Sequence, residues 1–503
     1  MKQHSSAARE RMRASVHPVY ASHILEPIFE FNCRHNFYPL LDAHRAWLVM
    51  LAEQKLVPQP DAAAIFRALD ELEKTGPDAL RPFDASVEFY YLHMERALVA
   101  RVPGGEAVVG NLNLGRTRPE PLHRMVLRER LLRVLDDVLR TRQTLIERAD
   151  AEAETVMPGY THLLHAQPTT LGHYLAAIHD HLMRDTQRLL AAYETTDRCT
   201  LGCGAMSGTS LPIDRQRVRE LLGFAALCEN TLDSVSSTDH AAQAAAALAS
   251  VMTLIGRLAQ DLYIFSSQEF GMIDVTDTFA SPSSLMPQKK NGLVLEYVRA
   301  RTAQTIGALT SCLAVMHNVG YMDTEDVELE NYRPLFDALT HVDEALPTMQ
   351  ALIEVMQPDR ELMRQRAASG FSSVTALAET IQTREKVSYR TAHRVVARAV
   401  LLAVERRRDA TGIDAALLNE AARETLGREL TLDQSAIAQA LDPRQFVQHH
   451  AGIGATAPKE VRRMVAERRD VLVRDREGLA TRRQRLESAK KALRSAAAAV
   501  AKS

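Results

Sequence analysis

Cysteine is scarce in this chain of 503 residues. An odd and scattered set does not make a disulfide scaffold, which needs an even number of cysteines in a short secreted chain. Cys199 and Cys203 are four residues apart, but no second Cys or His pair lies nearby to complete a zinc site. We therefore expect buried thiols, no bound metal and no cofactor. The cysteines are Cys33, Cys199, Cys203, Cys228 and Cys312.

The sequence also lacks a long hydrophobic run and an excess of charge of either sign. Its longest predominantly apolar run, residues 244–256, is shorter than the roughly 20 residues that cross a bilayer. Lys and Arg total 61 against 63 Asp and Glu, which argues against a dedicated nucleic-acid-binding protein. The basic N-terminal segment has no apolar stretch, unlike a secretory signal. We expect a cytoplasmic protein that binds neither membranes nor nucleic acid.

Alternating β-branched residues are nearly absent, so no sheet of any size is expected. By contrast, residues 122–156 contain neither Gly nor Pro, and apolar residues recur there at helical spacing. Helices of this length suit a bundle shared between subunits, so the predicted fold class is all-α. The apolar stripe comprises Leu127, Leu131, Val134, Val138 and Leu145, and further long helices are predicted over residues 169–198, 240–267, 291–317 and 334–356.

The chain is too long for one compact core, and we expect three helical domains. The N-terminal helical domain covers residues 1–115, the long-helix bundle residues 116–363, and a C-terminal helical domain with a charged tail residues 364–503. The tail carries one apolar residue in every seven between Val465 and Leu493, whereas a coiled coil needs two. This thin stripe predicts a helix that lies on the surface of the protein.

The most informative segment is residues 281–291, which read Ser-Pro-Ser-Ser-Leu-Met-Pro-Gln-Lys-Lys-Asn between two predicted helices. Small residues leave backbone N–H groups accessible, and the following helix directs its N-terminus towards the loop. Lys289 adds a positive charge and Asn291 a neutral donor. This combination suits a carboxylate whose negative charge grows during a reaction.

The same segment, followed by Glu296, resembles the signature of the aspartase/fumarase superfamily, and most closely its argininosuccinate lyase branch. The matching motifs occur in the family's order and span roughly residues 40 to 465. The resemblance implies an all-α homotetramer that needs no cofactor and shares its active sites between subunits, with Thr161 and Ser283 of one site coming from different chains. The further matching stretches are residues 158–168, 201–215, 374–379, 389–393 and 454–458.

The family chemistry is a β-elimination. A proton leaves the carbon next to a carboxylate, an aci-carboxylate dianion forms, and a C–N or C–O bond breaks to give fumarate. By this resemblance Ser283 is the general base, and it needs surroundings that stabilise its alkoxide. Lys289 and Asn291 would hold the dianion.

The resemblance also assigns the residues around the leaving group. Thr161 would hold a substrate carboxylate, and His162 would lie near the leaving nitrogen and pair with Glu296, which fixes its charge state. Which group protonates that nitrogen stays open. The remaining residues that the resemblance assigns to substrate binding are Thr117, Arg118, Gln167, Ser284, Met286 and Tyr321.

The residues expected to bind the amine portion depart from the family pattern. Pro119 replaces an Asn, and Pro has neither a polar side chain nor an N–H group. With the Pro-Leu-Phe stretch that follows as the anchor, Leu329 stands at the position of a Gln and Tyr332 at that of a Lys, and both family residues contact the arginine portion. Thr238 replaces an Arg. Losing such contacts changes specificity strongly.

We therefore predict a C–N lyase that converts an N-substituted aspartate reversibly to fumarate and an amine, which could be a diamine. A true argininosuccinate lyase, releasing arginine, is the alternative. Gln288 and Lys290 disfavour a C–O lyase of the fumarase type. A structural derivative without activity, of the δ-crystallin kind, is a minor alternative, because such a protein has no reason to keep five of the expected site residues together. These five are Thr161, His162, Ser283, Lys289 and Asn291.

Overall fold

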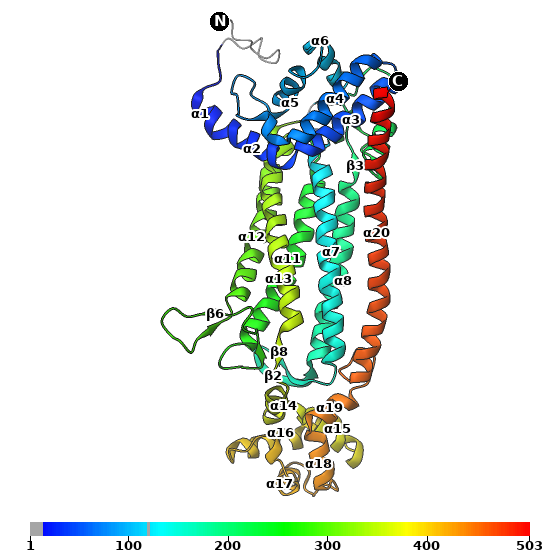
Figure 1. The fold of residues 1–503 in the computed structure, drawn as a ribbon. Helices are drawn as coiled ribbons and strands as arrows, with labels where there is room; N and C mark the ends of the chain where they lie inside the picture. The colour runs from blue at the N-terminus through cyan, green and yellow to red at the C-terminus, as the bar shows by residue number, and fades with distance from the viewer. Residues whose placement is uncertain (1–13, 118–120, 503) are drawn as a thin grey trace.

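The long helices predicted from the sequence form one elongated bundle in the computed structural model, which describes residues 14–117 and 121–502 (Figure 1). Each begins and ends within a few residues of its predicted bounds, apart from the C-terminal end of the first. The all-α fold class is therefore confirmed. The five helices are α7 (Leu122–Ala151), α8 (Leu171–Thr196), α11 (Asp239–Phe265), α12 (Leu293–Met316) and α13 (Tyr332–Val355).

The predicted stripe on α7 lies in the core of this bundle, with every one of its five residues buried. Gly172 lets α8 begin directly against the end of α7, because a Cβ there would lie 2.4 Å from the Ala149 carbonyl oxygen. The Gly172 N–H donates to the Glu152 carbonyl at 3.0 Å. Glu152 is itself fully buried and pairs with Arg360 at 2.7 Å, so this junction is fixed by both packing and charge.

One of these helices has the composition of a membrane span. By length and apolar content α11 is long enough to cross a bilayer, but 61% of its most apolar window is buried inside the protein. Its neighbours are α8, α12 and α13. The predicted role as a buried core helix accounts for its apolar sequence.

An N-terminal lobe covers one end of the bundle (Figure 1). Its core is built around Trp47, which is fully buried and donates from Nε1 to the Leu114 carbonyl at 3.1 Å. Segments between α8 and α11 pack onto the same core. The elements of the lobe are α1 (Pro18–Tyr20), η2 (Ala21–Leu25), α2 (Glu26–His35), α3 (Phe37–Glu53), α4 (Gln59–Thr75), η3 (Pro77–Leu80), α5 (Tyr90–Val99), α6 (Glu106–Val109) and η4 (Gly110–Asn113), joined by β3 (Arg198–Cys199), α9 (Arg215–Leu221), β4 (Ala226–Leu227) and α10 (Thr231–Ser236).

A C-terminal lobe of shorter helices covers the opposite end (Figure 1). Aspartate side chains cap several of these helices: Asp414, Asp433 and Asp442 each accept a hydrogen bond from a backbone N–H of the first turn. The lobe has its own apolar cluster. Its elements are α14 (Arg360–Ser369), η6 (Phe371–Ser373), α15 (Val374–Glu385), α16 (Tyr389–Glu405), η7 (Ala410–Gly412), α17 (Ala415–Leu426), α18 (Gln434–Leu441) and α19 (Pro443–His449).

Strands are few and short. The described part of the chain contains no sheet of more than two strands, as predicted. The largest, an antiparallel hairpin of β1 (Val156–Thr161) and β2 (Leu164–Thr170), was not predicted. A small ladder of β5 (Ile273–Asp274) and β8 (Gln357–Pro358) joins the segments that follow α11 and α13.

The C-terminal helix α20 (Pro458–Lys502) returns along the whole bundle from the C-terminal lobe to the N-terminal lobe (Figure 1). Its 45 residues span about 68 Å at about 1.5 Å per residue. Leu472, Leu479, Leu486 and Leu493 are all buried, so the predicted single stripe does lay this helix on the body of the protein. The three-domain boundaries remain a proposal, because α20 packs into the cores of both the bundle and the N-terminal lobe.

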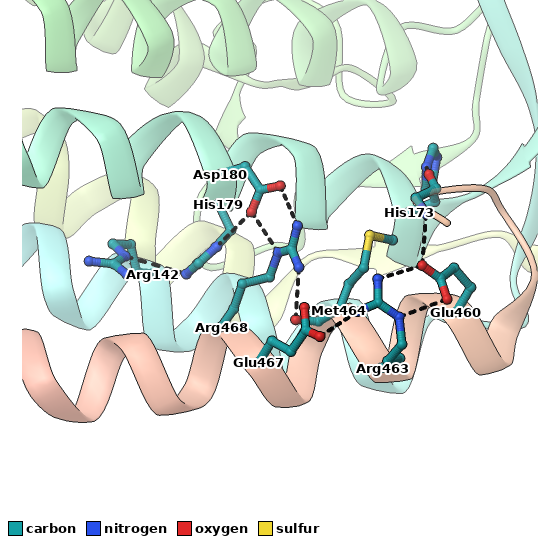
Figure 2. Close-up of polar contacts among 10 residues, drawn as sticks. Arg142, His173, His179, Asp180, Glu460, Arg463, Met464, Glu467 and Arg468 are labelled. Carbon is teal, nitrogen blue, oxygen red and sulfur yellow. Dashed lines mark hydrogen bonds and ion pairs between the residues drawn. The ribbon is translucent and has the colours of Figure 1, made fainter. Parts of the chain in front are cut away.

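Charged residues flank the apolar stripe and attach α20 to α8 (Figure 2). Arg468 donates two hydrogen bonds, each of 2.6 Å, to the carboxylate of Asp180. Fully buried His179 accepts from Arg142 Nε at 3.3 Å through Nε2, so its Nδ1 carries the proton and donates to Asp180 at 3.3 Å. Charged residues such as Arg468, which occupy positions where a coiled coil would need apolar residues, therefore attach α20 to the bundle.

Candidate active site

The signature segment forms a loop that projects from the side of the bundle (Figure 1). Its two ends pair as the short antiparallel strands β6 (Ser281–Pro282) and β7 (Lys290–Asn291). The side chain of Asn291 donates from Nδ2 to the Ser281 carbonyl at 3.2 Å. The strands close the base of the loop and leave its tip, from Ser284 to Lys289, exposed.

The two consecutive lysines of the loop have different surroundings. Lys290 Nζ forms ion pairs with Asp274 at 2.8 Å and with Asp277 at 2.9 Å, and these hydrogen bonds raise the pKa of Lys290. Within the described ranges no carboxylate forms an ion pair with Lys289. Lys290 therefore anchors the loop, whereas the charge of Lys289 stays available to an anionic substrate.

The hydroxyl of Ser283 lies at the start of the loop tip. Its oxygen accepts hydrogen bonds from the backbone N–H groups of Met286 at 3.0 Å and Leu285 at 3.3 Å. Donors aimed at a hydroxyl oxygen favour its deprotonated form. One chain supplies these two donors to the Ser283 hydroxyl oxygen. Leu285, 84% exposed, and Met286 are apolar groups that a second surface would cover.

The matching stretch at residues 158–168 includes the turn of the β1–β2 hairpin. His162 and Leu163 have φ of 55° and 59°, the left-handed conformation that both central residues of a type I′ turn require. Thr161, His162 and Leu163 are exposed at its tip. Next to the turn, Tyr160 packs on Phe265 of the bundle, so the turn presents its polar residues outward on a fixed support.

Two predicted site residues contact other parts of the same chain. Glu296, in the first turn of α12, accepts a hydrogen bond from Tyr263 Oη at 3.1 Å. Gln167 donates from Nε2 to Thr375 Oγ1 at 3.2 Å. Among the described residues of one chain, no hydrogen bond or ion pair joins His162 to Glu296. The predicted pairing of His162 with Glu296 therefore stays a prediction.

Thr117, one of the residues assigned to substrate binding, lies at the other end of the bundle, beneath the N-terminal lobe. Thr117 lines a narrow cavity of about 60 Å³ together with Thr238 and Asp323. Tyr321 donates from Oη to Asp233 at 2.6 Å, and this hydrogen bond raises the pKa of the tyrosine. Arg118, predicted to bind a substrate carboxylate, lies outside the described residues. The cavity is the enclosed part of the candidate site within one chain.

Tyr332, which stands where the family has a Lys, closes this cavity as part of a buried aromatic cluster. Its ring stacks on His123 with centroids 4.3 Å apart, and its Oη lies 2.7 Å from His240 Nε2. Burial lowers the pKa of His123 to about 4 and that of His240 well below its usual value. These groups are therefore neutral at pH 7, and the position offers no charge to a carboxylate. Leu329, at the Gln position, is buried as well.

Sequence reasoning missed both histidines. Each lies on the buried face of a helix, His123 on α7 and His240 on α11. In the sequence, the spacing of neither histidine distinguishes it from the core residues around it. His240 Nδ1 and Thr238 Oγ1 are buried without a hydrogen-bond partner among the described residues. Both residues line the narrow cavity, so these two atoms can form hydrogen bonds with a bound molecule. Within the same ranges, no group of three or more His, Cys, Asp or Glu side chains is arranged to hold a metal ion.

Two family models match the chain. The lyase model covers residues 39–307, and the argininosuccinate lyase C-terminal model covers residues 371–448. The argininosuccinate lyase 1 of Shouchella clausii is 32% identical over 469 residues, which are 93% of this chain and 94% of that protein. The argininosuccinate lyase of Methanothermobacter thermautotrophicus is 34% identical over 446 residues, covering 88% and 94%.

Solved structures agree with these matches. An EDDS lyase variant with bound fumarate superposes with a TM-score of 0.86 at 32% identity, covering 97% of each chain. The class II fumarase of Schistosoma mansoni, at 15% identity and a TM-score of 0.67 over 81% of this chain and 89% of that one, shares the fold. The loop with Ser283 and the hairpin with His162 are thus parts of a known architecture, and the chain belongs to the argininosuccinate lyase-like branch of the aspartase/fumarase superfamily, as a carbon–nitrogen lyase.

Proposed function

We propose that the protein cleaves an N-substituted aspartate into fumarate and an amine, and that it catalyses the reverse addition. The observation that carries this proposal is the loop in which Ser283 Oγ receives two backbone N–H groups while Lys289 has no carboxylate partner among the described residues. The likeness to an EDDS lyase with bound fumarate supports the same chemistry.

In the proposed elimination, Ser283 Oγ removes a proton from the carbon next to the β-carboxylate of the substrate. The electron pair moves onto that carboxylate, where Lys289 and Asn291 stabilise the dianion. The electrons then form the double bond of fumarate as the Cα–N bond breaks, and the nitrogen leaves with the bonding pair and takes up a proton. Thr161 holds a carboxylate, and His162, paired with Glu296, lies near the nitrogen.

The remaining assignments complete the substrate site. Ser284 and Met286 contribute from the loop tip, and Gln167 from the hairpin. Thr117 and Tyr321 would bind from the end of the bundle beneath the N-terminal lobe, and Arg118, which lies outside the described residues, is proposed to bind a substrate carboxylate.

The active unit proposed here is a homotetramer with shared sites. The three groups of site residues lie on the projecting loop, on the β1–β2 hairpin and beneath the N-terminal lobe. Helix α12 also exposes apolar side chains along the bundle: Tyr297 is 66% exposed and Leu313 52%, and nothing lies within 4 Å of a Cβ built on Gly307. Exposed apolar surface of this kind is typical of subunit interfaces, so a second copy is the expected cover for α12.

The test is direct. Fumarate and a panel of amines are incubated with the purified protein, and the absorbance of fumarate is followed. Loss of absorbance with at least one amine, and fumarate release from the corresponding N-substituted aspartate, support the proposal. If no amine on a panel that includes arginine is consumed, the proposed reaction is wrong.

A true argininosuccinate lyase is the second candidate, and the names of the similar proteins favour it. The neutral side chains of Tyr332 and Leu329, both buried, argue against it. Cytoplasmic location and independence of any cofactor remain predictions from the sequence.

A further inference from the structure

A cavity of about 480 Å³ lies outside the candidate active site, where the N-terminal lobe meets helices α7 and α20. Its walls come from the end of α2, the start of α3, the first part of α7, the end of α9 and the last part of α20. Figure 1 shows α20 and α12 on opposite sides of the bundle, so this cavity is remote from the exposed face of α12 that a second copy is expected to cover. We call it the basic cavity.

Positive side chains outnumber negative ones in the lining of the basic cavity. Five cations line it against two carboxylates, and both carboxylates already have partners. Glu129 pairs with Lys490 at 2.9 Å. Asp42 pairs with two arginines outside the lining, Arg45 at 3.4 Å and Arg494 at 3.3 Å. The five cations are Arg34, Arg128, Arg130, Arg133 and Lys490.

Three of the lining arginines belong to α7. Arg128 is neutralised by Asp197 at 3.3 Å, and both side chains are buried. Arg130 and Arg133 share one carboxylate, that of Asp343, at 2.8 and 3.9 Å. The Nε atoms of Arg128 and Arg130 are buried without a hydrogen-bond partner among the described residues. Because a buried donor without a partner costs free energy, this wall favours an acceptor that the described chain does not supply.

Arg34 brings an unpaired charge to the same part of the cavity. It is exposed and forms no ion pair with any described residue, and the acid nearest to it in sequence, Glu30, pairs with another arginine at 2.7 Å. Burial lowers the pKa of the adjacent His35, and the charges of Arg34 and Arg130 lower it further. Asp337, an exposed carboxylate outside the lining, acts in the opposite direction. Even when Asp337 is counted, the arginines here outnumber the carboxylates.

The rest of the lining is largely apolar. Met125 and Val126 of α7 contribute to it, together with Leu222 at the end of α9 and Leu493 of α20. The exposed ring of Tyr38 also lines the cavity. The cavity is larger than a single phosphate ion requires, so an organic group attached to an anion would have an apolar wall to pack against.

We propose that the basic cavity binds a phosphate group, either as free phosphate or as a phosphomonoester whose organic part packs on the apolar wall. Arginine presents its N–H groups in a rigid fork that matches phosphate oxygens. A phosphate group brings a charge of about −1.5 to −2 at pH 7, which suits Arg34, Arg130 and Arg133 better than a single carboxylate does. The ligand would join the N-terminal lobe to the bundle, since Arg34 belongs to α2 and the other two arginines to α7.

Calorimetric titration of the intact protein with inorganic phosphate tests the residues, with the ionic strength held constant by sodium chloride. Arg34→Gln and Arg133→Gln each remove one charge at an exposed position, so the fold should survive. Each should weaken phosphate binding by about tenfold or more, the effect of losing one charge-assisted hydrogen bond. Arg384→Gln, at an exposed position of α15 in the opposite lobe, is the matched control and should leave the affinity unchanged. An unchanged affinity in both cavity variants would overturn the proposal.

A parallel titration with phenyl phosphate separates the two sources of the phosphate group. Tighter binding of phenyl phosphate than of inorganic phosphate supports a phosphomonoester as the ligand, because the ring then packs on the apolar wall. Equal affinities support free phosphate. Phenol, which lacks the anion, should not bind. Absence of binding for both phosphate compounds would refute the assignment of this cavity.

The candidate active site also binds anions in the proposed function, so a variant of its loop separates the two sites. Lys289→Ala should keep the phosphate affinity of the natural protein, and saturating fumarate should leave that affinity unchanged. Loss of phosphate binding in Lys289→Ala, together with full binding in Arg34→Gln, would place the anion in the candidate active site and overturn the proposal. The outcome does not depend on whether the proposed elimination is correct.

Discussion

At the scale of single residues, Ser283 is the centre of the proposed chemistry. We expect Ser283→Ala to lower turnover by about 10²–10⁴-fold, the usual scale for loss of a general base. The thermal midpoint should not change, since the side chain is only partly buried and contacts two backbone N–H groups of its own loop. Steady-state kinetics of fumarate release measure the effect.

The matched control for this substitution is Ser488→Ala. Ser488 is exposed on α20, far from the loop in sequence, and its replacement should leave turnover unchanged. Near-normal turnover in Ser283→Ala would show that another group removes the proton.

Specificity is also decided by single side chains. Tyr332 supplies a neutral phenol where an argininosuccinate lyase has a lysine, and a charge-assisted hydrogen bond to a carboxylate contributes about 1.5–3 kcal/mol. Argininosuccinate should therefore be a poor substrate, with the defect in KM. A kcat/KM for argininosuccinate of about 10⁴ M⁻¹s⁻¹ or more, within the normal enzyme range, would restore the argininosuccinate lyase assignment.

At the scale of elements, α20 is held by a single apolar stripe. Leu479 is 95% buried between this helix and the bundle. We expect Leu479→Ala to lower the free energy of unfolding by about 2–5 kcal/mol, the range for a buried leucine. Val473→Ala, at a position of the same helix that is 54% exposed, should change it by less than about 0.5 kcal/mol. Denaturant unfolding followed by circular dichroism compares them, and equal losses would show that the stripe does not fix the helix.

The ion pair of α20 with α8 predicts a dependence on pH. Burial favours the neutral form of Asp180, but hydrogen bonds from His179 and Arg468 outweigh it and lower the pKa of Asp180 to about 2. A carboxyl whose pKa is lower in the folded than in the unfolded state stabilises the fold at any pH above the unfolded pKa. This stabilisation is lost as the pH falls towards 2. The shift from 3.8 corresponds to roughly 2 kcal/mol.

Asp180→Asn should therefore be less stable than the natural protein by roughly 2 kcal/mol at pH 7. The difference should shrink between pH 4 and pH 2, where the natural carboxylate becomes protonated. Unfolding free energies measured in parallel across this range provide the test. A difference that does not vary with pH would mean that the charge of Asp180 is not what stabilises the contact.

The same elements show what could be predicted from the sequence. The long helices and the surface position of α20 followed from the spacing of apolar residues, which reports burial directly. The β1–β2 hairpin could not be predicted, because its turn depends on positive φ at His162 and Leu163, residues that seldom signal such a turn. The site motifs were found by resemblance, but the neutral pair of His123 and His240 and the basic cavity depend on tertiary packing that no local pattern reveals.

At the scale of the whole molecule, shared sites predict complementation between inactive proteins. Ser283→Ala and His162→Ala are each expected to be inactive as homotetramers. When the two are denatured, mixed and refolded together, some sites will combine an intact loop from one chain with an intact hairpin from another. A measurable part of the fumarate-releasing activity should then return.

The control mixture combines Ser283→Ala with Lys289→Ala, whose changes lie on the same loop. No site in that mixture can contain an intact loop, so no activity should return. Recovery in the control, or none in the first mixture, would contradict a site built from several chains.

The path of α20 has a consequence for the order in which the protein is made. Leu493 and Ala497 belong to the apolar core of the N-terminal lobe, and Arg494 pairs with Asp42, 452 residues earlier. At about 5–20 residues per second, the ribosome adds those residues roughly 20 to 90 s after Asp42. Throughout that interval the N-terminal lobe exposes apolar surface that its last partner will cover. We therefore expect the N-terminal lobe to need chaperones during translation until the C-terminal end of α20 has been synthesised.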